Sequence, residues 1–451
     1  MEKNLTTGSV FKNVVWFSLP YLLSYFLQTL YGMADLFIIG QYDKVASTTA
    51  VSVGSQIMHM ITVMIVGLAM GTTVNIAQAI GANDKKQAAK AIGNTIILFM
   101  GVAVVGMIVL LLSVYQIVSV MSTPAEAVNG TVTYLTICFI GIPFITAYNI
   151  ISAIFRGMGD SKSPMYFIAV ACVANILLDY LFMGAFKLGP AGAALETTIS
   201  QAISVLVSLI VIVKRKSVVL GKTDFKPHRA IMRKLLSIGI PIAVQDGLIQ
   251  VAFIVITIIA NQRGLNDAAA VGIVEKIISF LFLVPSSMLS TVSALGAQNI
   301  GADKPERAIA TLRYAILIAT GFGILATIII QFTAGPIVAL FTDGNTASGA
   351  DVIRLGSQYL RGYIFDCIFA GIHFSFSGYF CACGKSGLSF LHNIIAIVMV
   401  RIPGVYLTSQ MFQTTLFPMG LATAAGSLLS VLICIAAFCV IRRKESTVKG
   451  V

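Results

Sequence analysis

Charged residues are scarce in this sequence. They make up 11% of its 451 residues, while apolar residues make up 57%. An ordinary soluble domain has about 25% charged and roughly 45–50% apolar residues. A water-soluble fold of this length could not bury so much apolar surface. The composition therefore excludes a soluble protein and indicates that lipid is the solvent.

Catalytic and metal-binding motifs are also missing. Cys381 and Cys383 form an isolated C-x-C pair, which indicates neither a zinc site nor a disulfide framework. The four histidines show no H-E-x-x-H spacing. Gly384-Lys385-Ser386 lacks the earlier glycine of a phosphate loop, because that position is Tyr379. We therefore expect no enzyme activity and no bound cofactor, with an ion gradient in place of ATP as the energy source.

Apolar stretches long enough to cross a bilayer recur along the whole chain. The first is too long for a signal peptide and has no small-residue cleavage site after it, so we expect it to remain as a helix. We predict an all-α polytopic membrane protein with twelve transmembrane helices, at about residues 14–39, 46–78, 92–120, 131–155, 164–186, 191–213, 235–260, 268–299, 312–340, 355–380, 388–411 and 418–441.

The net charge of +12 reflects an uneven distribution of basic residues rather than a nucleic-acid site. Basic residues concentrate after every second predicted span, and the opposite loops hold only Lys44, Lys187, Arg263 and Arg354. The positive-inside rule then places both termini in the cytoplasm. The basic residues on the predicted cytoplasmic side are Lys85, Lys86, Lys90, Arg156, Lys162, Lys214, Arg215, Lys216, Lys222, Lys226, Arg229, Arg233, Lys234, Lys304, Arg307, Arg313, Lys385, Arg442, Arg443, Lys444 and Lys449.

The second half of the chain repeats the first. FSLPYLL from Phe17 corresponds to SIGIPIA from Ser237, and QAIGANDKKQAAKA from Gln78 corresponds to QNIGADKPERAIA from Gln298. Six spans per half is an even number, so both halves enter the membrane in one orientation, related by a pseudo-two-fold axis along its normal. We predict an N-lobe at 1–213, a basic cytoplasmic linker at 214–234 and a C-lobe at 235–451. Duplication around a central cleft is typical of alternating-access transporters.

Three segments resemble one transporter family. QTLYGMADLFIIGQY (28–42), GANDKKQA (81–88) and FRGMGDSKSPM (155–165) are similar to the multidrug and toxic compound extrusion (MATE) family, in particular its bacterial DinF-like branch. The resemblance covers essentially the whole chain. It implies a V-shaped pair of six-helix bundles in the bacterial inner (plasma) membrane. It also implies a monomer that exports organic, often cationic, compounds using the inward flow of sodium ions or protons.

Polar residues inside the spans of the first half predict a cation site. Asn175 and Asp179 lie one turn apart on one helix face, and at 1.5 Å per residue their depth in the bilayer matches that of Thr197. Asp35 can reach the same level if the first helix tilts or kinks at Pro20. Oxygen ligands suit a hard cation such as sodium, while burial beside a like charge favours a protonated carboxylate that can carry a proton.

The resemblance supports this site, because Asp35, Asn175, Asp179 and Thr197 match cation-binding positions of the family resembled. Glu196 adjoins Thr197, and we expect it to point from another face of the helix.

The charges of the second half admit two interpretations. Asp366 lies near the position where some relatives place a cation-binding acid, and Gln250, with Asp246 one turn earlier, stands near the position where those relatives carry a glutamate. Glu275, Lys276, Arg361 and Arg401 could instead form internal ion pairs, because buried charges are rarely left unpaired. The candidates for substrate binding or coupling in this half are Asp246, Glu275, Arg361, Asp366 and Arg401.

Two functions remain open from the sequence. The first is a cation-coupled exporter of organic, cationic or amphiphilic compounds. The alternative is a lipid-linked sugar flippase of the same superfamily, whose cavity would favour cations such as Arg361 and Arg401. The acidic site of the first half argues against the flippase. A major-facilitator transporter is excluded because the loop after the second span lacks the G-x-x-x-D-R-x-G-R signature.

Overall fold

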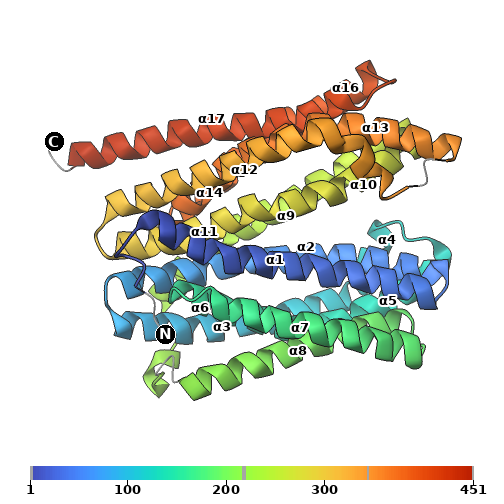
Figure 1. Cartoon of the computed structure of the whole chain (residues 1–451). Helices are drawn as coiled ribbons and strands as arrows, with labels where there is room; N and C mark the ends of the chain where they lie inside the picture. The colour runs from blue at the N-terminus through green and yellow to red at the C-terminus, as the bar shows by residue number, and fades with distance from the viewer. Residues whose placement is uncertain (1–3, 216–219, 343–344, 449–451) are drawn as a thin grey trace. The chain divides into compact units, whose positions relative to one another are not determined.

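The computed structural model describes residues 4–215, 220–342 and 345–448 (Figure 1). Every regular element in these ranges is helical, which confirms the all-α prediction. Two of the predicted cytoplasmic basic residues, Lys216 and Lys449, lie outside the described residues. The predicted linker at 214–234 is described in part, with a short 3₁₀ helix, η2 (Lys222–Phe225), before the next long helix begins at Arg229.

The chain divides into two compact units. The first unit comprises Met1–Gly8, Val15–Ala243 and Ala297–Lys304, and the second comprises Ser9–Val14, Val244–Gly296 and Pro305–Val451. The division therefore crosses three helices, since α1, α9 and α11 each contribute residues to both units.

The first unit is built largely from the helices of the first half. In chain order these are α1 (Val10–Tyr42), α2 (Val45–Gly81), α3 (Lys85–Leu112), α4 (Val114–Val120), α5 (Ala125–Ile140), α6 (Ile142–Gly157), α7 (Lys162–Asp179), the π-helical η1 (Tyr180–Ala185) and α8 (Pro190–Arg215). Among the residues that the structure describes, two clusters of buried apolar side chains contribute to its core, one including Leu135 and Phe139 of α5 and the other Phe155 and Phe167.

The second unit is built largely from the second half. Its helices are α9 (Arg229–Arg263), α10 (Leu265–Leu281), α11 (Leu283–Gly301), α12 (Pro305–Ala339), α13 (Ala347–Tyr363), α14 (Phe365–Ala382), α15 (Ser386–Ala396), the π-helical η3 (Ile397–Arg401), α16 (Ile402–Met411) and α17 (Phe417–Val448). One continuous apolar core includes the fully buried Tyr359 and Tyr363 of α13.

Length and composition support the predicted spans. Eleven helical segments in the described residues are long and apolar enough to cross a membrane, and α5 with α6 makes a twelfth if this pair, bent by 48°, is one span. The bend lies at Gly141, just before Pro143, whose missing N–H and ring geometry interrupt a continuous helix. On α3, Val105, Val109 and Leu112 expose 54–76% of their surface, as expected for side chains that face lipid.

The backbone repeats between the halves as the sequence predicts. Asn83 and Asp303, which are 220 positions apart, both adopt left-handed backbone with φ of 57° and 54°. Asn and Asp tolerate this conformation better than other side chains do. Gly159 and Gly384 also share a positive φ. The fifth span of each half contains a π-helical segment, η1 in the first and η3 in the second.

The ends of α2 and α11 contact each other reciprocally within the first unit. The α-carbon of Gly81 approaches the backbone of Gln298 so closely that a side chain there would meet it, and Gly301 approaches the backbone of Gln78 in the same way. These four residues are two pairs of equivalents in the duplication. Glycine is required at both positions because nothing larger fits.

Candidate cation site

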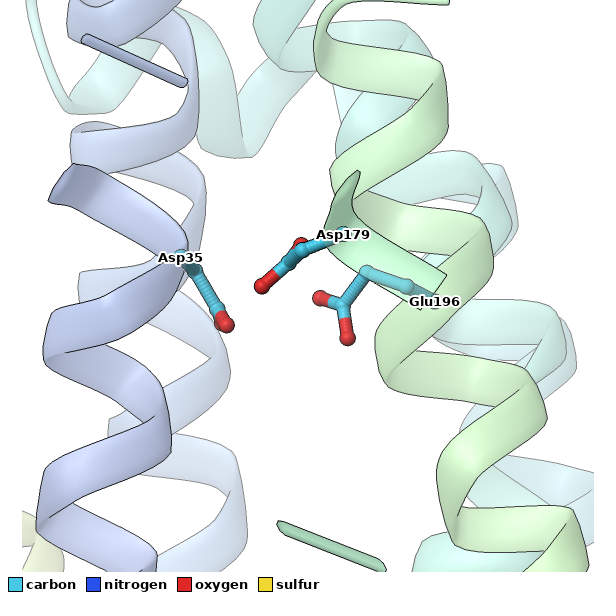
Figure 2. A group of neighbouring side chains, drawn as sticks. All are labelled: Asp35, Asp179 and Glu196. Carbon is cyan, nitrogen blue, oxygen red and sulfur yellow. The ribbon is translucent and has the colours of Figure 1, made fainter. Parts of the chain in front are cut away.

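Three carboxylates converge inside the first unit from three different helices (Figure 2). Asp35 comes from α1, Asp179 from the last position of α7 and Glu196 from α8. One oxygen from each lies within 4.8 Å of the others. Their side chains are buried, with exposed fractions of 6%, 0% and 0%.

Helix geometry explains how two of these acids are positioned. Asp179 is the residue at which α7 passes into the π-helical η1, and π-helical turns inside α-helices occur frequently at functional sites. Pro190 begins α8, where the fixed φ of proline and its missing N–H are compatible with a first helical turn. Glu196 follows six residues later and therefore lies in the second turn of α8.

The two neutral residues predicted for the site both contact Glu196. Asn175 Nδ2 donates a hydrogen bond to Glu196 Oε2. Thr197 Oγ1 lies 2.6 Å from Glu196 Oε1 and 3.1 Å from the carbonyl oxygen of Ala193, so its single proton can serve either acceptor. The structure therefore brings Asp35, Asn175, Asp179 and Thr197 to one place, and Glu196 connects the neutral pair to the acids.

The expectation that Glu196 points from another face of α8 is wrong. Successive residues of a helix do not face each other at the level of Cβ. The glutamate side chain has two methylene groups, however, and these let the carboxylate turn back toward both Asn175 and its neighbour Thr197. The length of the glutamate side chain was the feature of the sequence that could have indicated this orientation. The position of Glu196 on the helix alone predicts the wrong one.

The cluster has no cationic partner in the described part of the chain, where no Lys, Arg or His forms an ion pair with any of the three acids. Within the same residues, Asp35 Oδ1, Asn175 Oδ1 and both carboxylate oxygens of Asp179 are buried without a hydrogen-bond donor. Three neighbouring carboxylates can all stay ionised in such surroundings only if a cation balances their charge. Without a cation, at least one of them must bind a proton. The unpartnered oxygens are suitable ligands for a hard cation.

The charges of the second unit are arranged differently. Arg401, at the end of η3, forms an ion pair with Asp366 of α14, and both residues are buried. Arg361 and Lys276 are exposed, Asp246 is half-buried, and Glu275 Oε2 lies 3.4 Å from Thr257 Oγ1. Among the candidates of this half, the described structure brings together only Asp366 and Arg401.

A small cavity of about 40 Å³ adjoins this ion pair inside the second unit. Arg401 lines it together with His373, Asn393 and the aromatic side chains of Phe253 and Phe282. The volume suits one or two water molecules rather than an organic substrate. In the described conformation this cavity is not a substrate site.

Most of the chain is similar to known proteins. Residues 20–181 and 241–407 match the sequence model of the MatE family. The chain is 29% identical to "Probable multidrug resistance protein YpnP" of Bacillus subtilis, over 89% of this chain and 88% of that protein. It is 30% identical to "Probable multidrug resistance protein YoeA" of the same organism, over 74% of each. The "Multidrug export protein MepA" of Staphylococcus aureus is 24% identical over 90% of this chain and 89% of its own.

Solved structures show the same fold. A MATE protein crystallised in a straight conformation superposes with a TM-score of 0.89 at 24% identity, covering 99% of both chains. An outward-facing multidrug resistance MATE transporter gives a TM-score of 0.89 at 23% identity, covering 99% of this chain and 98% of its own.

Proposed function

Because the chain belongs to the multidrug and toxic compound extrusion family and is a multi-pass membrane transporter, we propose that it exports organic, cationic or amphiphilic compounds by antiport against sodium ions or protons. The observation that carries the proposal is the buried cluster of Asp35, Asp179 and Glu196, which has no cationic partner in the described residues.

The proposed ligands of the coupling ion are the oxygens of these three acids, with Asn175 and Thr197 as neutral partners. Sodium would bind to carboxylate and amide oxygens, and a proton would bind to one of the carboxylates. Either ion neutralises the cluster, and a neutral cluster costs less free energy to enclose within the membrane than a charged one. The occupied and empty sites would therefore favour different conformations, which is what alternating access by a coupled transporter requires.

The multidrug names of the relatives support small organic substrates for this chain as well. The ion pair in the second unit weakens the support for the flippase alternative. Its expected cationic cavity relied on Arg361 and Arg401, but Asp366 neutralises Arg401. We further propose that the protein works as a monomer in the bacterial plasma membrane.

Efflux from proteoliposomes that contain the purified protein tests the energy source. We expect an imposed sodium or pH gradient to drive export of an organic cation such as ethidium without ATP, because no nucleotide motif is present in the sequence. Imposing the two gradients separately identifies the coupling ion. Transport that needs ATP and continues after both gradients have collapsed would contradict antiport.

Cysteine labelling tests the proposed orientation. In a variant without its seven native cysteines, single cysteines at Lys86, Lys222 and Asn129 would all be exposed at the protein surface. If both termini are cytoplasmic, an impermeant maleimide added to intact cells should label position 129 and leave positions 86 and 222 unlabelled until the cells are opened. Labelling of position 222 in intact cells would overturn this topology.

A further inference from the structure

A basic cavity of about 540 Å³ lies in the first unit, where α3 and α9 begin. Lys86 and Lys90 of α3 line one side, and His228 and Lys234 line the other. The one acidic lining residue, Asp84, caps α3, with Oδ1 2.9 Å from the backbone nitrogen of Gln87. The lysine ammonium groups therefore dominate the charge of the cavity.

The two sides of the cavity are fixed to each other through the polypeptide before α9. Asn94 of α3 is buried, with 1% of its surface exposed. Its Nδ2 lies 3.4 Å and 3.3 Å from the carbonyl oxygens of Asp224 and Lys226, and its Oδ1 accepts a hydrogen bond of 2.7 Å from the backbone N–H of His228. Next to it, Gly93 lets the Asp224 backbone approach α3 closely. The backbone on the two sides of the cavity is therefore preorganised.

Lys234 is held in a defined position as well. Its Nζ lies 2.8 Å from Oε1 of Gln78, near the end of α2. This bond occupies one of the three donors of the ammonium group and leaves two available to a ligand. Three separate segments, at the end of α2 and the starts of α3 and α9, thus contribute to one cationic site.

The duplication provides an internal comparison for these lysines. At the offset of 220 residues, Lys86 corresponds to Glu306 and Lys90 to Ala310. Glu306 pairs with Arg442 at 3.1 Å. The same helix start therefore folds without the basic pair, so the fold does not require Lys86 and Lys90. Orientation in the membrane needs only a general excess of positive charge on one side. It does not require that Lys86, Lys90 and Lys234 line the same cavity.

We propose that this cavity binds a phosphate group, as presented by the headgroup of an anionic phospholipid. Lysine is an effective point-charge ligand for phosphate, and basic pockets between membrane helices bind anionic lipid headgroups. The cavity lies at the ends of α2, α3 and α9, which are long and apolar enough to be spans, so it opens at the depth of the lipid headgroups. Its volume is ample for a headgroup, since a water molecule takes up about 30 Å³.

Native mass spectrometry of the full-length protein in detergent tests the proposal with phosphatidylglycerol as probe and phosphatidylcholine as the zwitterionic comparison. The cavity variant is K86Q/K90Q/K234Q. The matched control, K222Q/K226Q/R233Q, removes the same charge from the same region at exposed side chains that do not line the cavity. We expect the wild type and the control to bind phosphatidylglycerol with affinities within about twofold of each other, and the cavity variant to bind it at least about tenfold more weakly.

Competition distinguishes the two sources of a phosphate group. Saturable binding of ATP or inorganic phosphate that depends on the three lysines, with no lipid preference, would support the site and assign it to a soluble ligand. Unfolding temperatures without lipid check the fold, and the single exposed variant K86E serves if the triple variant is unstable. Equal phosphatidylglycerol binding by the wild type and every cavity variant would overturn the proposal.

Discussion

Asp35→Asn and Asp179→Asn variants are each expected to lose gradient-coupled efflux while remaining folded in the membrane. Asparagine keeps the shape of the side chain and removes the charge that binds the cation. Losing a charged ligand from a buried site costs about 3 kcal/mol or more, which weakens cation binding about 100-fold. Efflux from proteoliposomes under the driving gradient measures the effect, and expression with thermal unfolding confirms the fold.

Variants of Glu196 and Thr197 test the contributions of the other residues at the site. Glu196→Gln should impair coupling as well, because Glu196 contacts both neutral partners of the site. Thr197→Ala should have a smaller effect, since water can replace one hydroxyl ligand.

Glu126→Gln is the matched control, since Glu126 is an exposed carboxylate in the first turn of α5. Normal coupling in both aspartate variants at wild-type expression would show that the cluster is structural. The search for the coupling site would then move to Asp366 and Glu275.

The Arg401–Asp366 pair is expected to show strong thermodynamic coupling. Arg401→Met leaves the buried carboxylate of Asp366 unpaired, and Asp366→Leu leaves the guanidinium unpaired, so each single variant should lose about 3–5 kcal/mol of unfolding free energy. The double variant should recover most of that loss, because apolar residues of similar volume can replace a buried ion pair at little cost. Unfolding in detergent, compared across the four proteins, measures the coupling.

The exposed pair of Arg354 and Asp351, 3.0 Å apart, provides the comparison. Removing it through Arg354→Met should cost less than about 1 kcal/mol, because solvent screens both charges. If the double variant of the buried pair is as unstable as the sum of its two singles, the ion pair does not stabilise the second unit in the way the structure indicates. Retained efflux by a stable double variant would show that Asp366 is not a coupling residue.

The predicted spans agree with the structure because the bilayer imposes a simple rule on the sequence. Every lipid-facing segment must be apolar, and its backbone must form its own hydrogen bonds. The shared depth of Asp179 and Thr197 was predictable because a helix has a regular rise per residue. These features depend on one helix at a time.

Features that depend on two helices were harder to predict. The partner of Arg401 is 35 residues earlier in the chain, on α14, and the sequence does not determine which face of η3 meets that helix. The π-helical turns rotate the following residues relative to an ideal helix. The residues of η1, directly after Asp179, and those of η3, directly before Ile402, therefore do not follow a period of about 3.6 residues per turn. The orientation of Glu196 was missed because its side chain, not its helix position, reaches the cluster.

The reciprocal contact between the ends of α2 and α11 has an evolutionary consequence. Gly81 meets Gln298 and Gly301 meets Gln78, which is the pattern of an isologous interface between two identical subunits. One glycine and one glutamine, each inherited twice through gene duplication, supply both sides of this contact. A larger residue at either glycine would clash with the opposite copy, so each repeat constrains its counterpart. Purifying selection should therefore preserve the contacting ends of α2 and α11 together, even though the charged residues at the π-helical segments of the two repeats have diverged.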